Sequence, residues 1–168
     1  YASSPLRGME QLLGMWPDII AQVPKATLHF YYGWETMPRM PRMDGFKRSM
    51  MAQIGKLPGV VWHGRVPQQQ LEQEMRTKGV LLYPCTFVEG FMIAGVRATA
   101  AGMIPVFRNV AALPEVQYPS PFATDATPLN AGGKQAFIAS AVAALKASEA
   151  GTYDRNVQRE WSKKHLWS

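Results

Sequence analysis

The sequence is poor in the features that mark secreted and membrane proteins. It contains one cysteine, no low-complexity tract and no internal repeat. A single cysteine cannot form an internal disulfide, which favours a reducing compartment. No stretch approaches the roughly 20 apolar residues that a membrane-spanning helix requires, and the first residues lack the pattern of a signal peptide. We therefore expect a cytoplasmic protein.

Metal ligands and clustered positive charge are also scarce. No group of His, Cys or Asp residues has metal-ligand spacing, so we expect no metal site. The net charge of +6 suits an anionic ligand or an acidic membrane face. The Lys and Arg residues are scattered and form no stripe, so we expect no nucleic-acid partner. Cys85 has no His or acid beside it in a recognisable arrangement, and we interpret it as a small buried residue.

What the sequence does contain is the composition of a globular protein. Of its 168 residues, 47% are apolar and 18% are charged. These values are typical of a folded chain with a sizeable core, and the length favours one domain over residues 1–168.

Residues 80–107 have the pattern of a βαβ unit. A short apolar strand ends at Tyr83 and is followed by a turn. Small and apolar residues predict a helix over residues 91–101, and Gly102 stands where a left-handed C-cap is expected. A second apolar strand follows over residues 104–107. Units of this kind build parallel sheets.

The loop at residues 84–90 is the natural place for a ligand in such a unit. Ligands of open parallel sheets bind beyond the carboxyl ends of the strands, and a helix N-terminus favours an anion such as phosphate. Gly90 allows close approach of the backbone to a ligand. Glu89 offers an acceptor for hydroxyl groups, for instance those of a sugar. The alternative is that Glu89 only caps the helix.

The remaining pattern predicts further helices and strands on both sides of this unit. They cover residues 6–22, 45–57, 68–78 and 134–149 as helices, and residues 26–32, 60–63 and 121–124 as strands. Pro17 is expected to kink the first helix or to split it in two, and Asp44 to cap the second. The loop at residues 33–44 is long and has an apolar edge, so we expect it to be mobile and to touch a membrane or a partner domain.

The tail at residues 153–168 is predicted to form one more helix. Tyr153, Val157 and Trp161 recur on one side of it. We expect Trp161 and Trp167 to be exposed in the absence of a partner domain.

Two segments carry a resemblance to a known family. The string YPCTFVEGFMIAGVRATAAGMIPV resembles the donor-binding segment of retaining, nucleotide-sugar-dependent glycosyltransferases of the two-Rossmann-domain (GT-B) type, glycosyl transferases group 1. The matching positions are Tyr83-Pro84, Glu89-Gly90-Phe91, Ala98, Ala100-Ala101-Gly102 and Pro105-Val106. Arg97 departs from the pattern, because the family carries a second acid there that usually holds the ribose of the nucleotide.

The second segment, SSPLRG, resembles the loop that leads into the first helix of the family's donor domain. Arg7-Gly8 matches the basic residue and glycine that grip the donor diphosphate, and a guanidinium suits phosphate oxygens. Ser4, together with Ser3, adds further hydrogen-bonding groups. The alternative is a solvated Arg at a helix start.

The resemblance also implies a pocket wall around the nucleotide base. It is formed by the loop after the strand at residues 60–63, which contains His63, Gly64, Arg65 and Val66. A lone His at a strand end is more often structural than catalytic, so both interpretations of His63 stay open.

Together these matches imply an α/β fold, a three-layer Rossmann-like sandwich with a mainly parallel sheet that forms one half of a GT-B fold. The chain is then a donor-nucleotide-binding domain whose N-terminal acceptor-binding domain is absent, and we do not expect it to be active alone. Arg7 would hold the diphosphate of a nucleotide-diphosphate sugar, Glu89 would bind sugar hydroxyls, and no cofactor beyond this donor is implied. Arg97 either pairs with phosphate or abolishes binding.

Two alternative functions remain at this point. One is a degenerate, non-catalytic module that binds a sugar nucleotide, which the departure at Arg97 favours. The other is half of a nucleotide-sugar epimerase, which shares the two-domain architecture.

Overall fold

The computed structural model describes residues 1–35, 37 and 40–165, and shows a mixed α/β fold. A short 3₁₀ helix, η1, precedes the first α-helix. In chain order the elements are η1 (Pro5–Arg7), α1 (Met9–Gln22), β1 (Leu28–Phe30), α2 (Pro41–Ile54), β2 (Val60–Trp62), α3 (Gln68–Thr77), β3 (Val80–Tyr83), α4 (Ile93–Ala101), β4 (Ile104–Phe107), α5 (Leu113–Val116), α6 (Ala131–Ala150) and α7 (Arg155–His165).

The strands form two small parallel sheets. β1 pairs with β2, with Leu28 opposite Val60, and β3 pairs with β4, with Val80 opposite Ile104. The βαβ unit and the parallel pairing are as the sequence predicts. The single mainly parallel sheet is not, because β1 and β3 are not hydrogen-bonded to each other.

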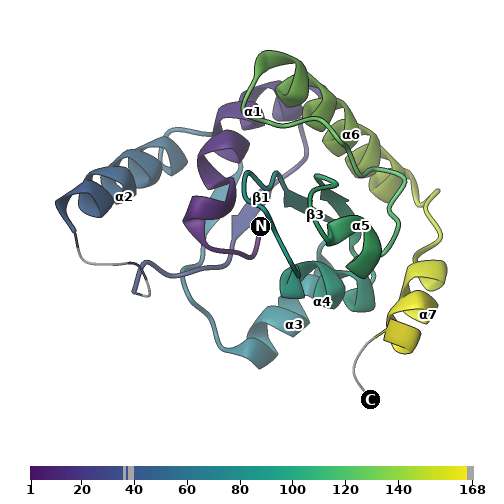
Figure 1. The fold of residues 1–168 in the computed structure, drawn as a ribbon. Helices are drawn as coiled ribbons and strands as arrows, with labels where there is room; N and C mark the ends of the chain where they lie inside the picture. The colour runs from purple at the N-terminus through teal and green to yellow at the C-terminus, as the bar shows by residue number, and fades with distance from the viewer. Residues whose placement is uncertain (36, 38–39, 166–168) are drawn as a thin grey trace.

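Helices cover the strands on two sides. Figure 1 shows α1 and α6 on one side of the strands and α3 and α4 on the other, with α2 to one side and α7 near the C-terminus. α6 contacts β3 and β4, α1 packs on α6, and α4 packs on β4, α3 and α7. The predicted three-layer arrangement is therefore present, and both faces of β3 and β4 are covered.

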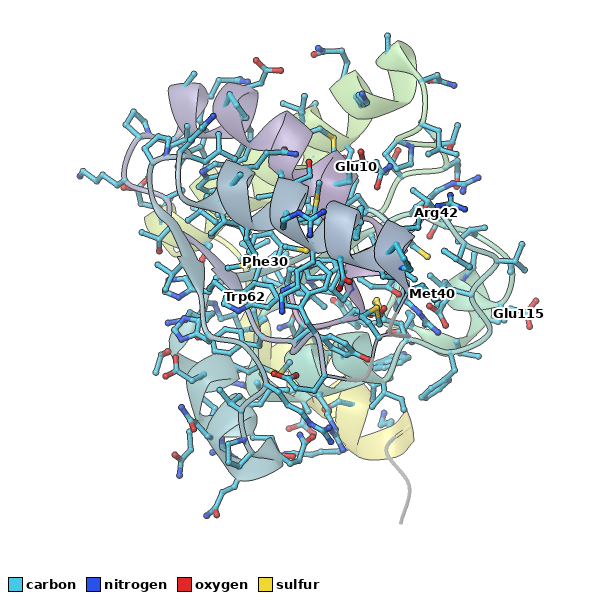
Figure 2. The ribbon with its side chains drawn as sticks, turned by 90° about the vertical axis from the view of Figure 1, so that its left-hand side faces the viewer. Glu10, Phe30, Met40, Arg42, Trp62 and Glu115 are labelled. Atoms are coloured by element: carbon cyan, nitrogen blue, oxygen red, sulfur yellow. The ribbon has the colours of Figure 1, made fainter. Side chains whose placement is uncertain are left out.

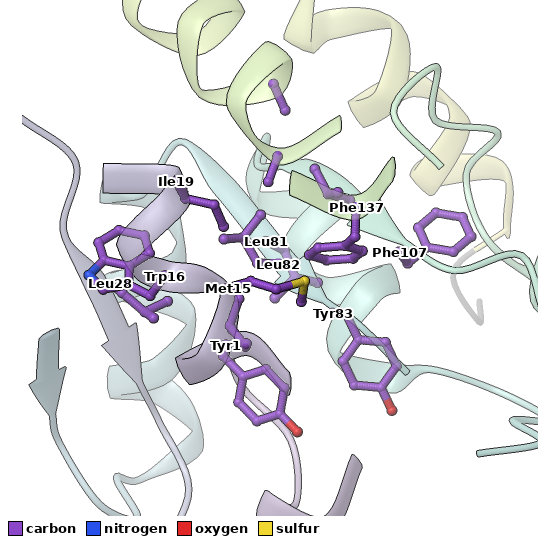
Figure 3. Packing of buried hydrophobic residues seen from close by; sticks show 14 of the residues in the cluster. Tyr1, Met15, Trp16, Ile19, Leu28, Leu81, Leu82, Tyr83, Phe107 and Phe137 are labelled. Atoms are coloured by element: carbon purple, nitrogen blue, oxygen red, sulfur yellow. The ribbon is translucent and has the colours of Figure 1, made fainter. Parts of the chain in front are cut away.

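The core explains why β3 and β4 are continuous apolar runs. A parallel strand that is covered on both faces has no solvent side, so apolar residues need not alternate with polar ones. All four residues of β4 are buried, and so are Leu81, Leu82 and Tyr83 of β3. Figure 3 shows Leu81 and Leu82 between Ile19 of α1 and the rings of Phe107 and Phe137.

The first predicted helix is divided into two elements. Gly8 has φ 109°, which ends η1 and precedes α1, so residues 6–22 are not one helix. Pro17 lies inside α1 and is exposed. The preceding residue, Trp16, is buried, and its indole Nε1–H donates to the carbonyl oxygen of Pro58 at 2.8 Å.

The second predicted helix begins earlier than expected. α2 starts at Pro41, its N-cap is Met40, and Asp44 lies in its first turn, so the prediction that Asp44 caps the helix is wrong. Proline at the first helical position has no N–H to leave unpaired. Part of the predicted mobile loop is thus helical, and residues 36, 38 and 39 of that loop lie outside the described residues.

α2 covers the outer part of the β1–β2 pair. Figure 2 looks onto α2, with Met40 and Arg42 at one end of the helix and the rings of Phe30 and Trp62 beneath it. These two rings are 6.3 Å apart, and Trp62 also stacks with Trp34 at 5.7 Å. Phe46 of α2 meets Trp34 edge to face.

The C-terminal half differs from the sequence prediction in two places. The predicted strand at residues 121–124 is reduced to an isolated bridge between Arg108 and Thr124. α6 begins three residues early, because Asn130 accepts a hydrogen bond from the backbone N–H of Gly133 at 2.8 Å and forms the N-cap.

α7 packs through a different face from the one predicted. Val157 is 56% exposed, whereas Gln158 and Ser162 are buried. The amide of Gln158 donates to the carbonyl oxygen of Met103 at 2.8 Å. Trp161 is half-buried and meets Tyr118 edge to face, so it is not fully exposed as predicted, and Trp167 lies outside the described residues.

No helix in the part of the chain that the structure describes is both long enough and apolar enough to cross a membrane.

Candidate functional site

The candidate site lies at the carboxyl end of β3, as the sequence predicts. α4 begins at Ile93 with Met92 as its N-cap, so Gly90 and Phe91 lie before the helix and not at its first turn. No side chain caps α4. The alternative that Glu89 only caps this helix is therefore wrong, and its carboxylate has other partners.

Glu89 is the buried anion of the site. Its residue is 6% exposed, and the phenol of Tyr83 donates to its Oε2 at 2.8 Å. The guanidinium of Arg7 donates to the same oxygen and forms an ion pair with it. Hydrogen bonds from two donors satisfy a carboxylate that burial would otherwise destabilise.

Gly8 brings Arg7 to this carboxylate. Its φ of 109° lies in the left-handed region that favours glycine, and a Cβ at this position would meet the backbone oxygen of Pro84. The loop before α1 and the loop after β3 therefore touch backbone to backbone. Only glycine permits this approach, which places the residue before it, Arg7, beside Glu89.

Both partners of Glu89 keep their protons over the physiological pH range. The phenol of Tyr83 and then the carboxylate of Glu89 raise the pKa of Arg7 above its ordinary value. Burial, followed by the bond to Glu89, raises the pKa of Tyr83 well above its usual range. Tyr83 thus remains a hydrogen-bond donor and Arg7 a cation.

A cavity of about 360 Å³ opens beside this ion pair, and we refer to it as the Arg7–Glu89 cavity. Its charged lining residues are Arg7, Glu89 and Arg97. The carboxylate of Glu89 neutralises the charge of Arg7, whereas Arg97 forms no ion pair with any described residue. The cavity therefore carries an excess of positive charge that suits an anionic ligand.

The cavity brings together about half of the residues that the sequence singled out. Those that line it are Ser3, Ser4, Arg7, Tyr83, Glu89, Phe91 and Arg97. Gly8, Pro84 and Gly90 stand next to lining residues in the chain and shape the two loops. The roles of all these residues in binding stay predictions.

His63, Gly64 and Arg65 lie apart from the Arg7–Glu89 cavity. Arg65 lines a neighbouring cavity of about 250 Å³ that shares Ala2, Tyr32 and Leu71 with it. His63 and Gly64 line neither of the two.

His63 belongs to a group of stacked rings on β1 and β2. Its Nε2 lies 2.9 Å from Nδ1 of His29, and its ring stacks on Tyr31 at 4.3 Å. Burial lowers the pKa of His29 to about 4, with a further contribution from Lys78. These contacts favour the structural interpretation of His63.

Sequence reasoning missed several residues that line the Arg7–Glu89 cavity. The additional lining residues are Ala2, Tyr32, Leu71, Met75, Met92, Ile93 and Ala94. Tyr32 follows β1 at the same edge of the strands as the loop after β3, and this signal was available from the strand prediction. Leu71 and Met75 belong to α3, and the sequence did not indicate that a cavity lies beside this helix.

Exposed apolar side chains gather along the loop before α4. Phe87, Val88, Phe91 and Ile93 are between 37% and 85% exposed, and Leu6 of η1 is 42% exposed. Phe91 and Ile93 also line the Arg7–Glu89 cavity.

Within residues 1–35, 37 and 40–165, no group of three or more His, Cys, Asp or Glu side chains is placed to hold a metal ion. Cys85 is buried, as predicted, and carries a free thiol.

Comparison with known proteins gives matches in structure and none in sequence. No protein-family profile matches the chain, and no curated protein matches it in a sequence search. Seventy-two chains of solved structures match significantly.

We describe three of the similar structures. A sucrose-phosphate synthase from Thermosynechococcus elongatus has a TM-score of 0.70 and 17% identity, and the match covers 95% of this chain and 38% of that protein. The pneumococcal O-GlcNAc transferase GtfA in complex with UDP and GlcNAc has a TM-score of 0.65, 17% identity and coverages of 98% and 32%. Anabaena HepE in complex with UDP and glucose has a TM-score of 0.58, 18% identity and coverages of 99% and 46%.

The chain thus spans less than half the length of each of these proteins, whereas each match covers nearly all of this chain. At this level of identity the likeness concerns the fold. The chain has the fold of one Rossmann-like part of a GT-B glycosyltransferase, which is the fold that its two motifs predicted.

Proposed function

We propose that the Arg7–Glu89 cavity binds a nucleotide-diphosphate sugar, and that the chain is the donor-binding unit of a retaining glycosyltransferase. The observation that carries this proposal is that Arg7, Tyr83 and Glu89 are joined by hydrogen bonds and together line a positively charged cavity. The cavity lies at the carboxyl end of a parallel strand, where α/β folds bind their ligands. Two proteins of similar fold were solved with UDP and a sugar.

Arg7 is suited to contact the diphosphate. Its side chain is 43% exposed, and Nη1 is the nitrogen that contacts Glu89. A guanidinium has five N–H donors in a fork that matches phosphate oxygens. The donors that face neither Glu89 nor Tyr83 are available to a ligand, and positive charge at this position stabilises the diphosphate as it leaves.

Glu89 is suited to the sugar rather than the phosphate. Oε2 accepts from both Tyr83 and Arg7, so the carboxylate is held in one orientation. Because the carboxylate is fixed, Oε1 accepts hydrogen bonds from one direction, and this is the condition for selective binding of hydroxyl groups.

The acceptor would bind to a second domain. The chain spans 32–46% of the length of the three similar proteins described above, which leaves room in each for at least one more domain. We propose that residues 1–168 act as one donor-binding unit, that transfer takes place between this unit and an acceptor-binding partner domain, and that the chain has no transferase activity alone.

Titration with UDP, UDP-glucose and UDP-GlcNAc tests the proposal, with chemical-shift changes as the readout. We expect saturable binding, and we expect Arg7→Ala to weaken it by roughly ten- to a hundredfold, because a charge-assisted hydrogen bond contributes about 1.5–3 kcal/mol. Arg48→Ala is the matched control, since Arg48 is exposed on α2 and lines neither this cavity nor its neighbour. Equal effects of the two variants would contradict the assignment of Arg7.

Arg97 favours a second candidate, the degenerate, non-catalytic module. It lines the cavity at the position where the resembled family carries an acid for the ribose. Absence of binding of all three compounds at millimolar concentration, by a chain that remains folded, would favour this candidate. Recovery of binding in Arg97→Glu would then identify Arg97 as its cause.

A further inference from the structure

A second cavity adjoins the Arg7–Glu89 cavity along α3 and α4. These two helices pack against each other, and Figure 1 shows them on the same side of the strands. The second cavity has a volume of about 260 Å³, and we refer to it as the α3–α4 cavity. Its lining residues are Glu72, Arg76, Arg97, Ala100 and Ala101. Of the described residues, Arg97 alone lines both cavities.

One face of α4 runs from the first cavity into the second. Ile93 and Ala94, in its first turn, line the Arg7–Glu89 cavity. Ala100 and Ala101, in its last turn, line the α3–α4 cavity. Arg97 lies three or four positions from each of them, and residues at this spacing share a face of a helix. The two cavities therefore meet at Arg97 and form one groove.

The opposite wall of this groove comes from α3. Leu71 and Met75 line the Arg7–Glu89 cavity, whereas Glu72 and Arg76, each one position later, line the α3–α4 cavity. On the α3 side the groove is therefore apolar beside the first cavity and charged beside the second.

The two guanidinium groups of the α3–α4 cavity have no acidic partner. Arg97 is half-buried and Arg76 is exposed, and neither forms an ion pair with a residue that the structure describes. Glu72, the acid of this cavity, accepts a hydrogen bond from the side-chain amide of Gln68 at 3.1 Å instead. Two like charges that line one cavity repel each other, and a bound anion would remove this repulsion.

Arg97 also serves a different part of the groove from Arg7. In the proposed function Arg7 contacts the diphosphate beside Glu89, and neither of these two residues lines the α3–α4 cavity. A guanidinium offers donors and no acceptor, so its strongest partners are carboxylate and phosphate groups. The groove therefore has a place for an anionic group in addition to the diphosphate.

We propose that the ligand of the Arg7–Glu89 cavity carries a second anionic group, a carboxylate or phosphate separate from its diphosphate, which Arg97 binds with support from Arg76. The inference rests on the proposed function and narrows its ligand to acidic nucleotide-diphosphate sugars, with the additional charge on the sugar or on the ribose. Arg97 is then a specificity-determining residue, because a neutral sugar nucleotide leaves its guanidinium without a partner.

Two pairs of ligands, each differing by one anionic group, test the inference. UDP-glucuronate and UDP-glucose differ by a carboxylate on the sugar, and 3′-phosphorylated UDP and UDP differ by a phosphate on the ribose. In titrations followed by chemical-shift changes, we expect the more anionic member of one pair to bind roughly ten- to a hundredfold more tightly than its match. The pair that shows this preference identifies whether the group lies on the sugar or on the ribose.

Substitution of Arg97 assigns the preference to this residue. We expect Arg97→Gln to abolish the preference, and Arg97→Lys, which keeps the positive charge, to retain part of it. The preference is a ratio of two affinities measured on the same variant, so a loss of folded protein affects both affinities equally. Arg48→Gln is the matched control, because Arg48 is exposed on α2 and lines neither cavity. It should show the wild-type preference.

The outcomes separate this inference from the proposed function. Equal binding within both pairs would overturn the inference and leave the proposed function standing. Absence of binding of all four ligands would overturn both. A preference that persists unchanged in Arg97→Gln would overturn the assignment of the second anionic group to Arg97.

Discussion

The ion pair between Arg7 and Glu89 allows a quantitative test of how the site is held together. In Arg7→Ala the carboxylate of Glu89 stays in place with the phenol of Tyr83 as its remaining hydrogen-bond partner among the described residues. The carboxylate is then a buried charge without a compensating cation, and we expect the folded state to lose stability.

The magnitude follows from the exposure of the two side chains. Removing one partner of a fully buried ion pair costs about 3–5 kcal/mol, and an exposed pair contributes about 0–1 kcal/mol. The Glu89 side chain is 7% exposed and that of Arg7 is 43% exposed, so water can enter where the guanidinium was. We therefore expect Arg7→Ala to lower the free energy of unfolding by about 1–2 kcal/mol.

A second substitution, Glu89→Gln, separates the cost of the buried, uncompensated carboxylate from other effects of removing the Arg7 side chain. Glu89→Gln in the Arg7→Ala background removes the uncompensated charge and keeps an acceptor for Tyr83, so the double variant should regain about 1 kcal/mol. Urea unfolding of the four proteins gives the coupling energy directly. If the two single costs add within about 0.3 kcal/mol, the residues are energetically independent and the reasoning is refuted.

Three further changes test other parts of the fold. Gly8→Ala places a Cβ against the backbone of Pro84 at a left-handed φ, and should lower the free energy of unfolding by roughly 2–4 kcal/mol in denaturant titrations. An unchanged free energy of unfolding would show that the two loops can separate freely. Because the pKa of His29 is about 4 when folded, below its ordinary 6.5, the unfolded chain binds more protons between these values. The contribution of His29 to the free energy of unfolding should be fully present above pH 6.5 and fall by roughly 1–2 kcal/mol towards pH 4, a value reduced for solvent screening of this partly exposed side chain. His29→Asn should flatten this pH dependence in denaturant titrations. Gln158→Leu leaves the carbonyl of Met103 without its buried partner and should cost about 1–3 kcal/mol, with earlier proteolysis of α7.

The order and type of the main elements were predictable from local pattern. The βαβ unit at residues 80–107 carries all of its signals within a short stretch: an apolar strand, small helix-forming residues, and Gly102 with φ 89° at the C-cap. The GT-B fold followed from two motifs, one of which places Arg7-Gly8 before α1. These features depend on residues that are close in the sequence, so the sequence alone indicates them.

Features that depend on distant partners were not predictable. The direction of Glu89 is set by Arg7, 82 positions away, so a capping role and a ligand role looked alike in the sequence. The buried face of α7 was expected to be the apolar one, but a bond to a carbonyl 55 positions away makes burial of Gln158 favourable. The start of α2 did have a local signal, because Pro41 suits the first helical position, and the acid at residue 44 was preferred wrongly.

The backbone contact between Gly8 and Pro84 has a practical consequence for how the protein can be divided. One wall of the cavity comes from the first helical segment and the other from the chain after the third strand, so neither portion holds a complete pocket. If the polypeptide were cut in the exposed turn near Lys56 and the two pieces were expressed separately, recovery of ligand affinity would report their reassociation. The pocket would then serve as a sensor for whatever proteins are fused to the two pieces.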